Sequence, residues 1–219
     1  MTFFGTRRRF AGMAATVALA FASLPAGAGT QAEERLAPSV VTVLSAAISD
    51  QPVPVDYGNR ADLRPWMDEM SRRLAPKVID GRTREEFLAT VHYEATRAGL
   101  DPQLVLGVIQ YESAFRKYAI STAGARGYMQ VMPFWTSLIG GGNNNLFHLR
   151  TNLRYGCVIL RHYLDVEEGD VYRALGRYNG SLGRPEYPTG VMTAVNRNWQ
   201  FAPIAAKLVP VSASLTVAR

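Results

Sequence analysis

The sequence predicts an all-α fold, and three observations support this prediction. Apolar residues recur at helical spacing in several segments, residues that cap helices precede these segments, and the strand-like alternation of apolar and polar residues is nearly absent. The chain has 219 residues, of which 47% are hydrophobic. A chain of this length and composition can bury one sizeable core, so we expect one folded domain.

The first 28 residues have the three parts of an export signal. Arg7–Arg9 provide positive charge, residues 11–24 form an apolar run, and residues 26–28 are small, as a cleavage site requires. The apolar run is too short to span a bilayer. We therefore expect a signal peptide over 1–28 and a periplasmic or secreted, cell-wall-associated protein without stable membrane insertion after cleavage. The paired arginines are compatible with twin-arginine export as well as the general route, and a retained anchor is the remaining alternative.

Residues 29–80 are predicted to form an N-terminal extension, partly disordered and partly helical. Its composition changes to a proline-containing linker at 50–58, and apolar residues at helical spacing follow within 61–78. We expect the folded catalytic domain over 81–201 and a tail over 202–219.

The domain itself is predicted to contain five helices. Thr83 and Glu86 form a capping box for the first helix, which Gly99 ends, and Asp101 caps the second. The second helix is expected to run to about Phe115, and the others cover the segments from about 151, 171–178 and about 190–200. Residues 116–148 are rich in Gly, Ser and Asn, and this composition predicts a flexible surface loop.

Charge and residue spacing exclude several classes of function. The net charge is +6, and it falls to +3 without the first 28 residues, which contain three arginines and no acid. The basic residues are not clustered as nucleic-acid binding requires, and no histidine has a partner at metal-ligand spacing. Cys157 has no second cysteine to pair with and is interpreted as a small apolar residue within a helix. The sequence implies no metal, cofactor or nucleic acid.

Glu112 is the acidic residue whose position suggests chemistry. It shares one helical face with Val105, Val108 and Ile109, near the C-terminal end of its helix. An apolar surrounding and the negative end of the helix dipole both disfavour a carboxylate and raise its pKa, as a general acid requires. The alternative is a partly buried glutamate paired with an arginine such as Arg116 or Arg126, and helix geometry leaves both interpretations open.

A second carboxyl is missing from the neighbourhood of Glu112 in the sequence. No Asp or Glu occurs from Ser113 to Leu164. Most glycosidases place two carboxyls on either side of the bond that they cleave. A second one could still come from elsewhere in the chain, for example from Glu94, Asp165 or Glu186.

Three motifs around Glu112 carry a resemblance to a known family. The segments "ESAF" with "STAGARGYMQVMP", then "TNLRYGCVIL" and "ALGRYNGSLG", resemble in this order the motifs of the soluble lytic transglycosylases, whose catalytic domain is lysozyme-like. The resemblance runs from about Phe87 to Asn198 and implies an all-α, lysozyme-like fold. Departures at Tyr128, at the pair 148–149 and at Ser181 concern the shape of the groove more than the chemistry.

The resemblance also implies roles for individual residues. Glu112 matches the single acid/base, and Tyr178 matches the tyrosine that reaches toward it. The residues that match substrate-binding positions are Ser121, Gln130, Met132, Tyr178, Asn179 and Tyr187. For Met132 and Tyr178, packing in the core is the alternative interpretation.

The activity that the resemblance implies is cleavage of peptidoglycan glycan strands without water. The β-1,4 bond between N-acetylmuramic acid and N-acetylglucosamine is broken, and the C6 hydroxyl closes a 1,6-anhydro ring, so no second carboxylate is needed. Secretion or cell-wall machinery is a candidate partner. The alternatives are a hydrolase of goose-lysozyme type and an inactive glycan-binding component of a secretion apparatus.

Overall fold

The computed structural model describes residues 31, 33–49, 52–142 and 144–202. The elements in chain order are α1 Pro38–Ala47, η1 Tyr57–Asn59, α2 Arg64–Leu74, α3 Gly81–Arg97, α4 Pro102–Ser113, α5 Phe134–Ile139, α6 Leu149–Val166, α7 Val171–Asn179, α8 Glu186–Ala194 and η2 Val195–Trp199. Within the described residues, β-pairing is limited to two isolated bridges that join Arg126 to Ile120 and to Val131. The predicted all-α class is confirmed.

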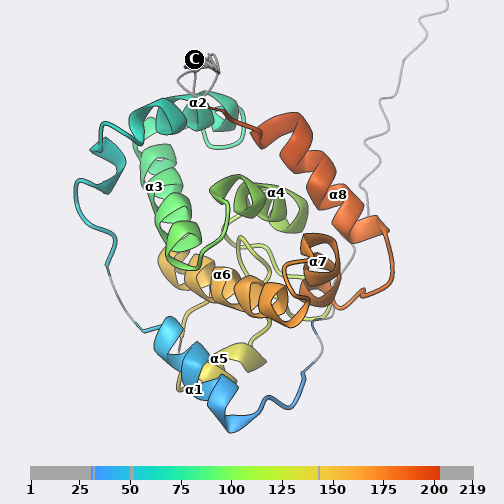
Figure 1. The fold of residues 1–219 in the computed structure, drawn as a ribbon. Coiled ribbons are helices and arrows are strands. Elements are labelled where there is room, and N and C mark those ends of the chain that lie inside the picture. The colour runs from blue at the N-terminus through green and yellow to red at the C-terminus, as the bar shows by residue number, and fades with distance from the viewer. Residues whose placement is uncertain (1–30, 32, 50–51, 143, 203–219) are drawn as a thin grey trace, which may run out of the picture.

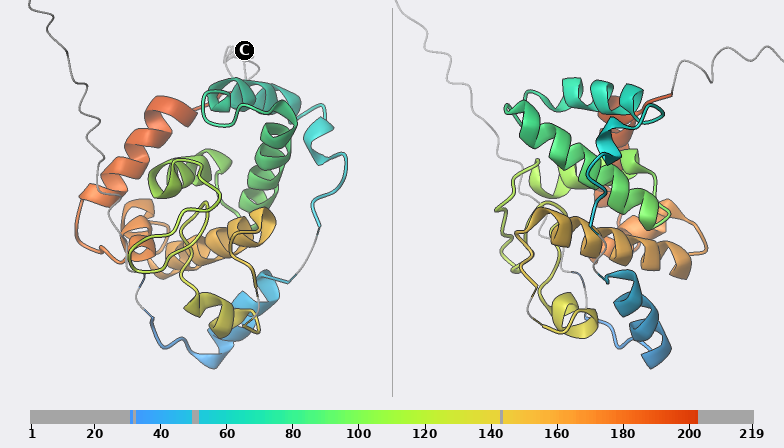
Figure 2. Two further views of the ribbon diagram at one scale, coloured as in Figure 1. Left: turned by 180° about the vertical axis from the view of Figure 1, so that it is seen from behind. Right: turned by 90° about the vertical axis from the view of Figure 1, so that its left-hand side faces the viewer.

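Helix α4 lies at the centre of the molecule, with α2, α3, α6, α7 and α8 around it (Figure 1). Its most extensive helix contact is with α8, and it also packs against α3 and η2. Leu106, Val108 and Ile109 of α4 are completely buried. The other views show α2 at one end of the molecule, with α1 and α5 beyond α6 at the opposite end (Figure 2). A residue at the end of α4 is therefore held from several sides.

The starts of α3 and α4 test the predicted helix caps. Asp101 caps α4 as predicted, because its Oδ1 accepts a hydrogen bond from Gln103 N at 2.8 Å. The predicted capping box at Thr83 is wrong. Asp80 is the cap of α3, and its Oδ1 accepts from both the backbone N (2.7 Å) and the hydroxyl (2.5 Å) of Thr83. The helix consequently begins at Gly81, and Thr83 already lies in its first turn.

The segment 116–148 is not the flexible surface loop that its composition predicts. Met129 and Val131 are completely buried, Leu146 is nearly so, and the short helix α5 interrupts the segment. Glycines mark turns within it, and the apolar residues between these turns enter the core.

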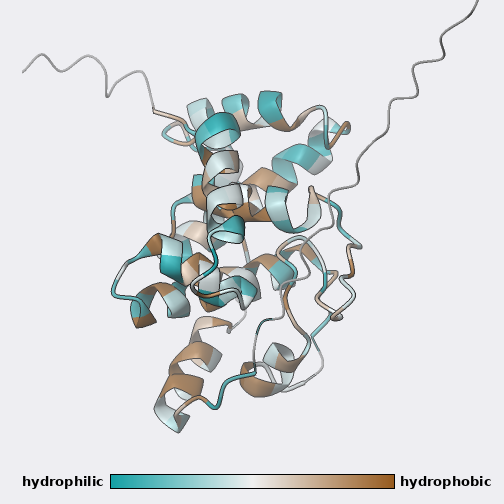
Figure 3. Ribbon diagram, turned by 90° about the vertical axis from the view of Figure 1, so that its right-hand side faces the viewer, coloured by the Kyte–Doolittle hydropathy of each residue, from teal (hydrophilic) through white to brown (hydrophobic). Residues whose placement is uncertain are grey.

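The N-terminal extension packs against the domain through α1 and α2. Helix α1, which is mostly apolar (Figure 3), contacts α5 and α6, and α2 contacts α3. The chain after α1 is fastened because Ser49 O accepts hydrogen bonds from Arg154 Nη1 at 2.9 Å and Arg97 Nη2 at 3.2 Å. The predicted signal peptide over 1–28 and residues 203–219 of the predicted tail lie outside the described residues. Among the described helices, none combines the length and apolarity that crossing a membrane requires.

A buried ion pair joins α3 to α6. Glu94 and Arg154 form two hydrogen bonds, at 2.7 Å from Nη2 to Oε1 and at 3.1 Å from Nε to Oε2. Their side chains are only 1% and 4% exposed, so solvent barely screens the two charges. Cys157, on α6, is a buried free thiol, in agreement with its interpretation as a small apolar residue.

Candidate functional site

Glu112 lies in the last turn of α4, where the chain reverses direction. Shortly after it, Ala114 and Phe115 have positive φ angles of 49° and 65°, a left-handed conformation that residues other than glycine adopt rarely. The Phe115 ring is held between Phe87 and Trp199, with ring centroids 6.0 Å and 5.4 Å away. Aromatic packing thus fixes the turn that ends the helix beside Glu112.

Tyr187 on α8 binds the carboxyl of Glu112. The Tyr187 hydroxyl donates a hydrogen bond of 2.6 Å to Glu112 Oε1, and the tyrosine itself is buried. Tyr111 packs edge-on against the Tyr187 ring, with centroids 5.1 Å apart. Gly190 permits this arrangement, since a Cβ atom there would lie 2.1 Å from Tyr111 Cε2. Close contact between α4 and α8 therefore orients the carboxyl.

The pKa of Glu112 is raised to about 8. Burial of the carboxyl is the cause, and the hydrogen bond from Tyr187 opposes it in part because it favours the ionised form. Part of the residue remains accessible, as contact with a substrate requires. The structure shows no ion pair between Glu112 and either Arg116 or Arg126. The Nε atom of Arg116 donates instead to Ser113 O. The predicted rise in pKa is confirmed, and a protonated carboxyl near neutral pH can act as a general acid.

The candidates for a second carboxyl are placed elsewhere. Glu94 is bound in the buried pair with Arg154, and Asp165 forms an exposed ion pair with Arg161. Glu186 is exposed at the start of α8. None of these carboxyls contributes to the pKa shift of Glu112. Within the part of the chain that the structure describes, no second carboxyl influences the ionisation of Glu112.

Tyr178 does not make the contact with Glu112 that the sequence predicts. It is completely buried, and its hydroxyl donates to Met129 O at 2.7 Å. The hydroxyl that reaches Glu112 is that of Tyr187, because α8 rather than α7 packs along α4. Tyr178 nevertheless lies near the site: its pKa is raised, first by burial and then by the charge of Glu112. It is both a packing residue and a neighbour of the carboxyl.

The loop beside the site is held by the motif at the start of α6. The Asn152 side chain accepts from Met129 N at 2.8 Å and donates to Arg126 O and Leu146 O, both at 2.8 Å. Gly156 allows Met129 to lie against α6, since a Cβ there would be 2.4 Å from the Met129 Sδ. An asparagine followed four residues later by glycine therefore fastens the loop at Arg126, Met129 and Leu146.

Two of the predicted substrate-binding residues use their polar atoms to shape this loop. Gln130, with a positive φ of 48°, donates from Nε2 to Ala119 O at 3.1 Å and Gly127 O at 2.9 Å. The Ser121 hydroxyl accepts from Ala125 N at 3.1 Å. The Gln130 carbonyl oxygen and the Ser121 hydroxyl proton keep further hydrogen-bonding capacity, and the role of both residues in substrate binding stays a prediction.

Asn179 and Met132 differ from those two residues. Asn179 is buried, and its Nδ2 has no hydrogen-bond partner among the described residues. A buried donor without a partner is costly, and a ligand or water that accepts from it removes this cost. Met132 is partly buried beside α5 and packs against the core. Their roles in substrate binding remain predictions.

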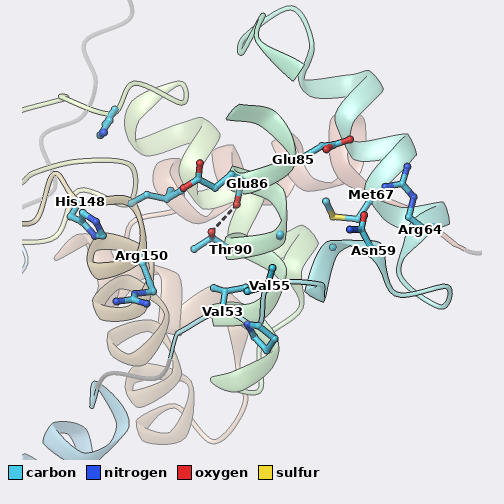
Figure 4. A pocket seen from close by; sticks show the side chains of 15 residues that line it. Val53, Val55, Asn59, Arg64, Met67, Glu85, Glu86, Thr90, His148 and Arg150 are labelled. Carbon is cyan, nitrogen blue, oxygen red and sulfur yellow. Dashed lines mark hydrogen bonds between the residues drawn. The ribbon is translucent and has the colours of Figure 1, made fainter. Parts of the chain in front are cut away.

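A separate cavity of about 660 Å³ lies between α2, α3 and the start of α6 (Figure 4). Apolar residues such as Val53 and Met67 line it together with charged and polar residues such as Glu86 and Arg150. Glu112 is not among its lining residues. Because it lacks the carboxyl with the raised pKa, we do not assign the chemistry to this cavity.

Comparison with known proteins identifies the domain that holds these residues. Residues 89–188 match the family model "Transglycosylase SLT domain". The chain is 33% identical over 118 residues to a transglycosylase of Enterobacteria phage PRD1, an alignment that covers 51% of this chain and 43% of the phage protein. It is 47% identical over 63 residues to membrane-bound lytic murein transglycosylase C of Actinobacillus pleuropneumoniae, covering 27% of this chain and 17% of that protein.

The chain thus spans less than half the length of these curated relatives. A solved structure of the lytic transglycosylase Slt from Pseudomonas aeruginosa aligns with 77% of this chain and 35% of its own, at 20% identity and a TM-score of 0.41, which is too loose for a residue-by-residue comparison. Glu112, Gln130, Met132, Tyr178 and Tyr187 all lie inside the family match. Residues 89–188 form a transglycosylase SLT domain, and the resemblance to the soluble lytic transglycosylases is confirmed.

Proposed function

We propose that the chain is an exported peptidoglycan lytic transglycosylase with Glu112 as its single acid/base. The observation that carries this proposal is a lone carboxyl with a pKa of about 8, oriented by Tyr187 within an SLT domain. The names of the relatives, transglycosylase and lytic murein transglycosylase, agree with it. A periplasmic or secreted location rests on the predicted signal peptide.

The mechanism follows from the protonation state of Glu112. The neutral carboxyl donates its proton to the glycosidic oxygen between N-acetylmuramic acid and N-acetylglucosamine, and the bond from that oxygen to C1 breaks. The N-acetyl group of the substrate stabilises the positive charge that develops at C1. Glu112, now a carboxylate, removes the proton from the C6 hydroxyl, and the C6 oxygen bonds to C1. The carboxyl regains its proton, and water is not consumed.

Tyr187 can assist both halves of this cycle. Its hydroxyl donates to Glu112 Oε1, which leaves the other oxygen to exchange a proton with the substrate. The same hydrogen bond favours the ionised form, so it stabilises the carboxylate that must later act as a base.

Product analysis tests this function against its alternatives. Digestion of purified peptidoglycan is expected to release muropeptides that are lighter by one water than those from a lysozyme digest of the same wall, as measured by mass spectrometry. Products with free reducing ends would indicate a hydrolase of goose-lysozyme type instead. Binding of the wall with no turnover would indicate an inactive glycan-binding component of a secretion apparatus.

Tyr187→Phe is expected to lower kcat by about tenfold, because the carboxyl loses the donor that orients it, and misplaced catalytic groups lose rate steeply. The alkaline limb of the pH–rate profile should also move to higher pH, since this hydrogen bond lowers the pKa of Glu112.

The matched control is Tyr178→Phe, which removes the corresponding hydroxyl oxygen from a tyrosine that donates to Met129 O. The control should lose about 1–3 kcal/mol of stability, because a buried carbonyl loses its donor, and its alkaline limb should stay within a few tenths of a pH unit. Equal pH profiles in the wild type and Tyr187→Phe would contradict the assigned role of Tyr187.

A further inference from the structure

Gln31 reaches the domain from outside the family match. It lies in the segment before α1, which runs from α1 toward α7 (Figure 1), and yet its side chain is buried, with 6% of the residue exposed. Polar side chains are seldom buried at the edge of a domain unless their hydrogen bonds are satisfied. The contacts of this carboxamide therefore indicate what the segment does.

The Gln31 carboxamide joins three parts of the domain. Its Oε1 accepts from Trp135 Nε1 at 3.0 Å and from Met132 N at 3.3 Å. Both partners are N–H donors, so the atom that faces them must be the carbonyl oxygen, and this fixes the orientation of the amide. Burial raises the pKa of Tyr178, and a hydrogen-bonding effect of the Gln31 side chain opposes this rise, so the amide also lies close to the phenol. Tyr178 in turn donates to Met129 O.

These contacts join Gln31 to two of the residues that are predicted to bind the glycan. Met132 and Tyr178 are predicted substrate-binding residues, and the charge of Glu112 acts on Tyr178. Without Gln31, the Trp135 indole N–H has no other acceptor among the described residues, and Trp135 is 2% exposed. The backbone of Met132 would lose its link to α7 at the same time.

The segment that carries Gln31 is fastened independently of this amide. Glu34 lies 3.7 Å from Arg177 of α7, Leu36 packs against the core, and Ser49 O accepts from Arg154 and Arg97 at the far end of α1. The segment that carries Gln31 is thus held against the domain by contacts that do not involve the Gln31 side chain. A change of the side chain alone should leave the path of the segment intact.

We propose that Gln31 is a positioning residue of the active site, which sets the place of the Met132 backbone and the Tyr178 ring for the glycan. The N-terminal extension then completes a groove whose other residues all come from the SLT domain and α8. This inference rests on the proposed function, because the role it assigns is expressed through the glycan.

Gln31→Met is the substitution that tests the proposal. It keeps the length and approximate volume of the side chain but removes both the acceptor and the donor. The value of kcat/KM on purified glycan is expected to fall about tenfold, mainly through a higher KM, because the loss concerns substrate binding more than the acid itself. Gln31→Glu retains an oxygen acceptor for Trp135 and Met132 and should keep most of the activity. Glu33→Met, at an exposed position in the same segment, is the matched control and should behave as the wild type.

A spectroscopic measurement separates the contact from the activity. The chain has three tryptophans, so a ¹H–¹⁵N correlation spectrum contains three indole signals, and Trp135→Phe identifies one of them. That signal should shift in Gln31→Met and remain near its wild-type position in Gln31→Glu and Glu33→Met. A shifted signal with unchanged kcat/KM would overturn the proposal and leave Gln31 a purely structural residue. A rise in kcat/KM would also overturn it, because the amide would then be obstructing the groove.

The activity of the wild-type protein tests the proposed function separately from the role of Gln31. If the wild-type protein releases no product from purified wall, the proposed function fails, whatever Gln31 does. If the wild type is active and Gln31→Met equals it in kcat/KM, only the role of Gln31 fails.

Discussion

Glu112→Gln is expected to reduce the rate of peptidoglycan cleavage by about 10³–10⁴-fold or more. General acid–base catalysis contributes about 10²–10⁴-fold, and here one group must act as both the acid and the base, so the loss should lie at the upper end. The amide keeps the volume of the carboxyl and can still accept from the Tyr187 hydroxyl, but it cannot transfer a proton. Release of muropeptides from purified wall, followed over time, measures the effect. Activity within tenfold of the wild type would move the catalytic acid elsewhere.

The pH dependence of the wild type provides the control for that result. Because the acid must be protonated, kcat/KM should fall as the pH rises through about 8, the pKa of Glu112, and the limb should be absent from the residual rate of Glu112→Gln. The stability of the fold should also depend on the ionisation of Glu112. Its pKa is higher in the folded state than in the unfolded state, so ionisation weakens the fold as pH rises from about 4.5 to about 8. Glu112→Gln should therefore be the more stable protein above pH 8, by about 1–3 kcal/mol after allowance for partial exposure.

Arg154→Met is expected to have the largest effect on stability, a loss of about 3–5 kcal/mol. Glu94 would be left buried with Arg97 Nη1 at 3.7 Å as its nearest cation, and a buried charge without a close partner is strongly destabilising. The carbonyl of Ser49 would also lose one of its two donors. Chemical denaturation followed by circular dichroism measures the change in the free energy of unfolding.

The double variant with Glu94→Leu separates charge from packing. Replacing both members of a buried ion pair by apolar residues of similar volume is often neutral or even stabilising. The pair of substitutions should therefore recover most of the stability that Arg154→Met loses. If the double variant were as unstable as Arg154→Met, packing around the guanidinium rather than the stranded carboxylate would account for the loss.

The helices and the carboxyl with the raised pKa could be predicted from sequence because their signals are local. Asp101 with Pro102 marks the start of α4, and an apolar stripe that ends in Glu112 places the carboxyl at the far end. The rise in its pKa follows from the same stripe. The motif at the start of α6 could be recognised in the sequence, but its physical role, fastening the loop through Asn152, needed the three-dimensional structure.

Contacts between distant segments could not be predicted in the same way. Tyr178 and Tyr187 lie nine residues apart on neighbouring helices, and only the packing of α8 along α4 decides which hydroxyl reaches Glu112. The loop 116–148 is expected to be flexible because its sequence is rich in glycine, serine and asparagine, and its apolar residues follow no periodic pattern that shows which of them are buried. Gln31 is farther still from its partners, and nothing in its neighbourhood in sequence distinguishes it from a solvent-exposed residue.

The contact between Phe115 and Trp199 has a consequence for the exchange of the SLT domain between proteins by recombination. Trp199 lies beyond the last residue of the family match, and α3, which carries Phe87, begins before its first. A recombination event at the borders of the match would cut α3 within its length and remove both of the rings that hold the turn after Glu112. The part that can be inherited as a functioning unit is consequently longer than the part that sequence families recognise. Insertions and fusions in relatives should fall outside the span from Gln31 to Trp199, or in exposed loops within it.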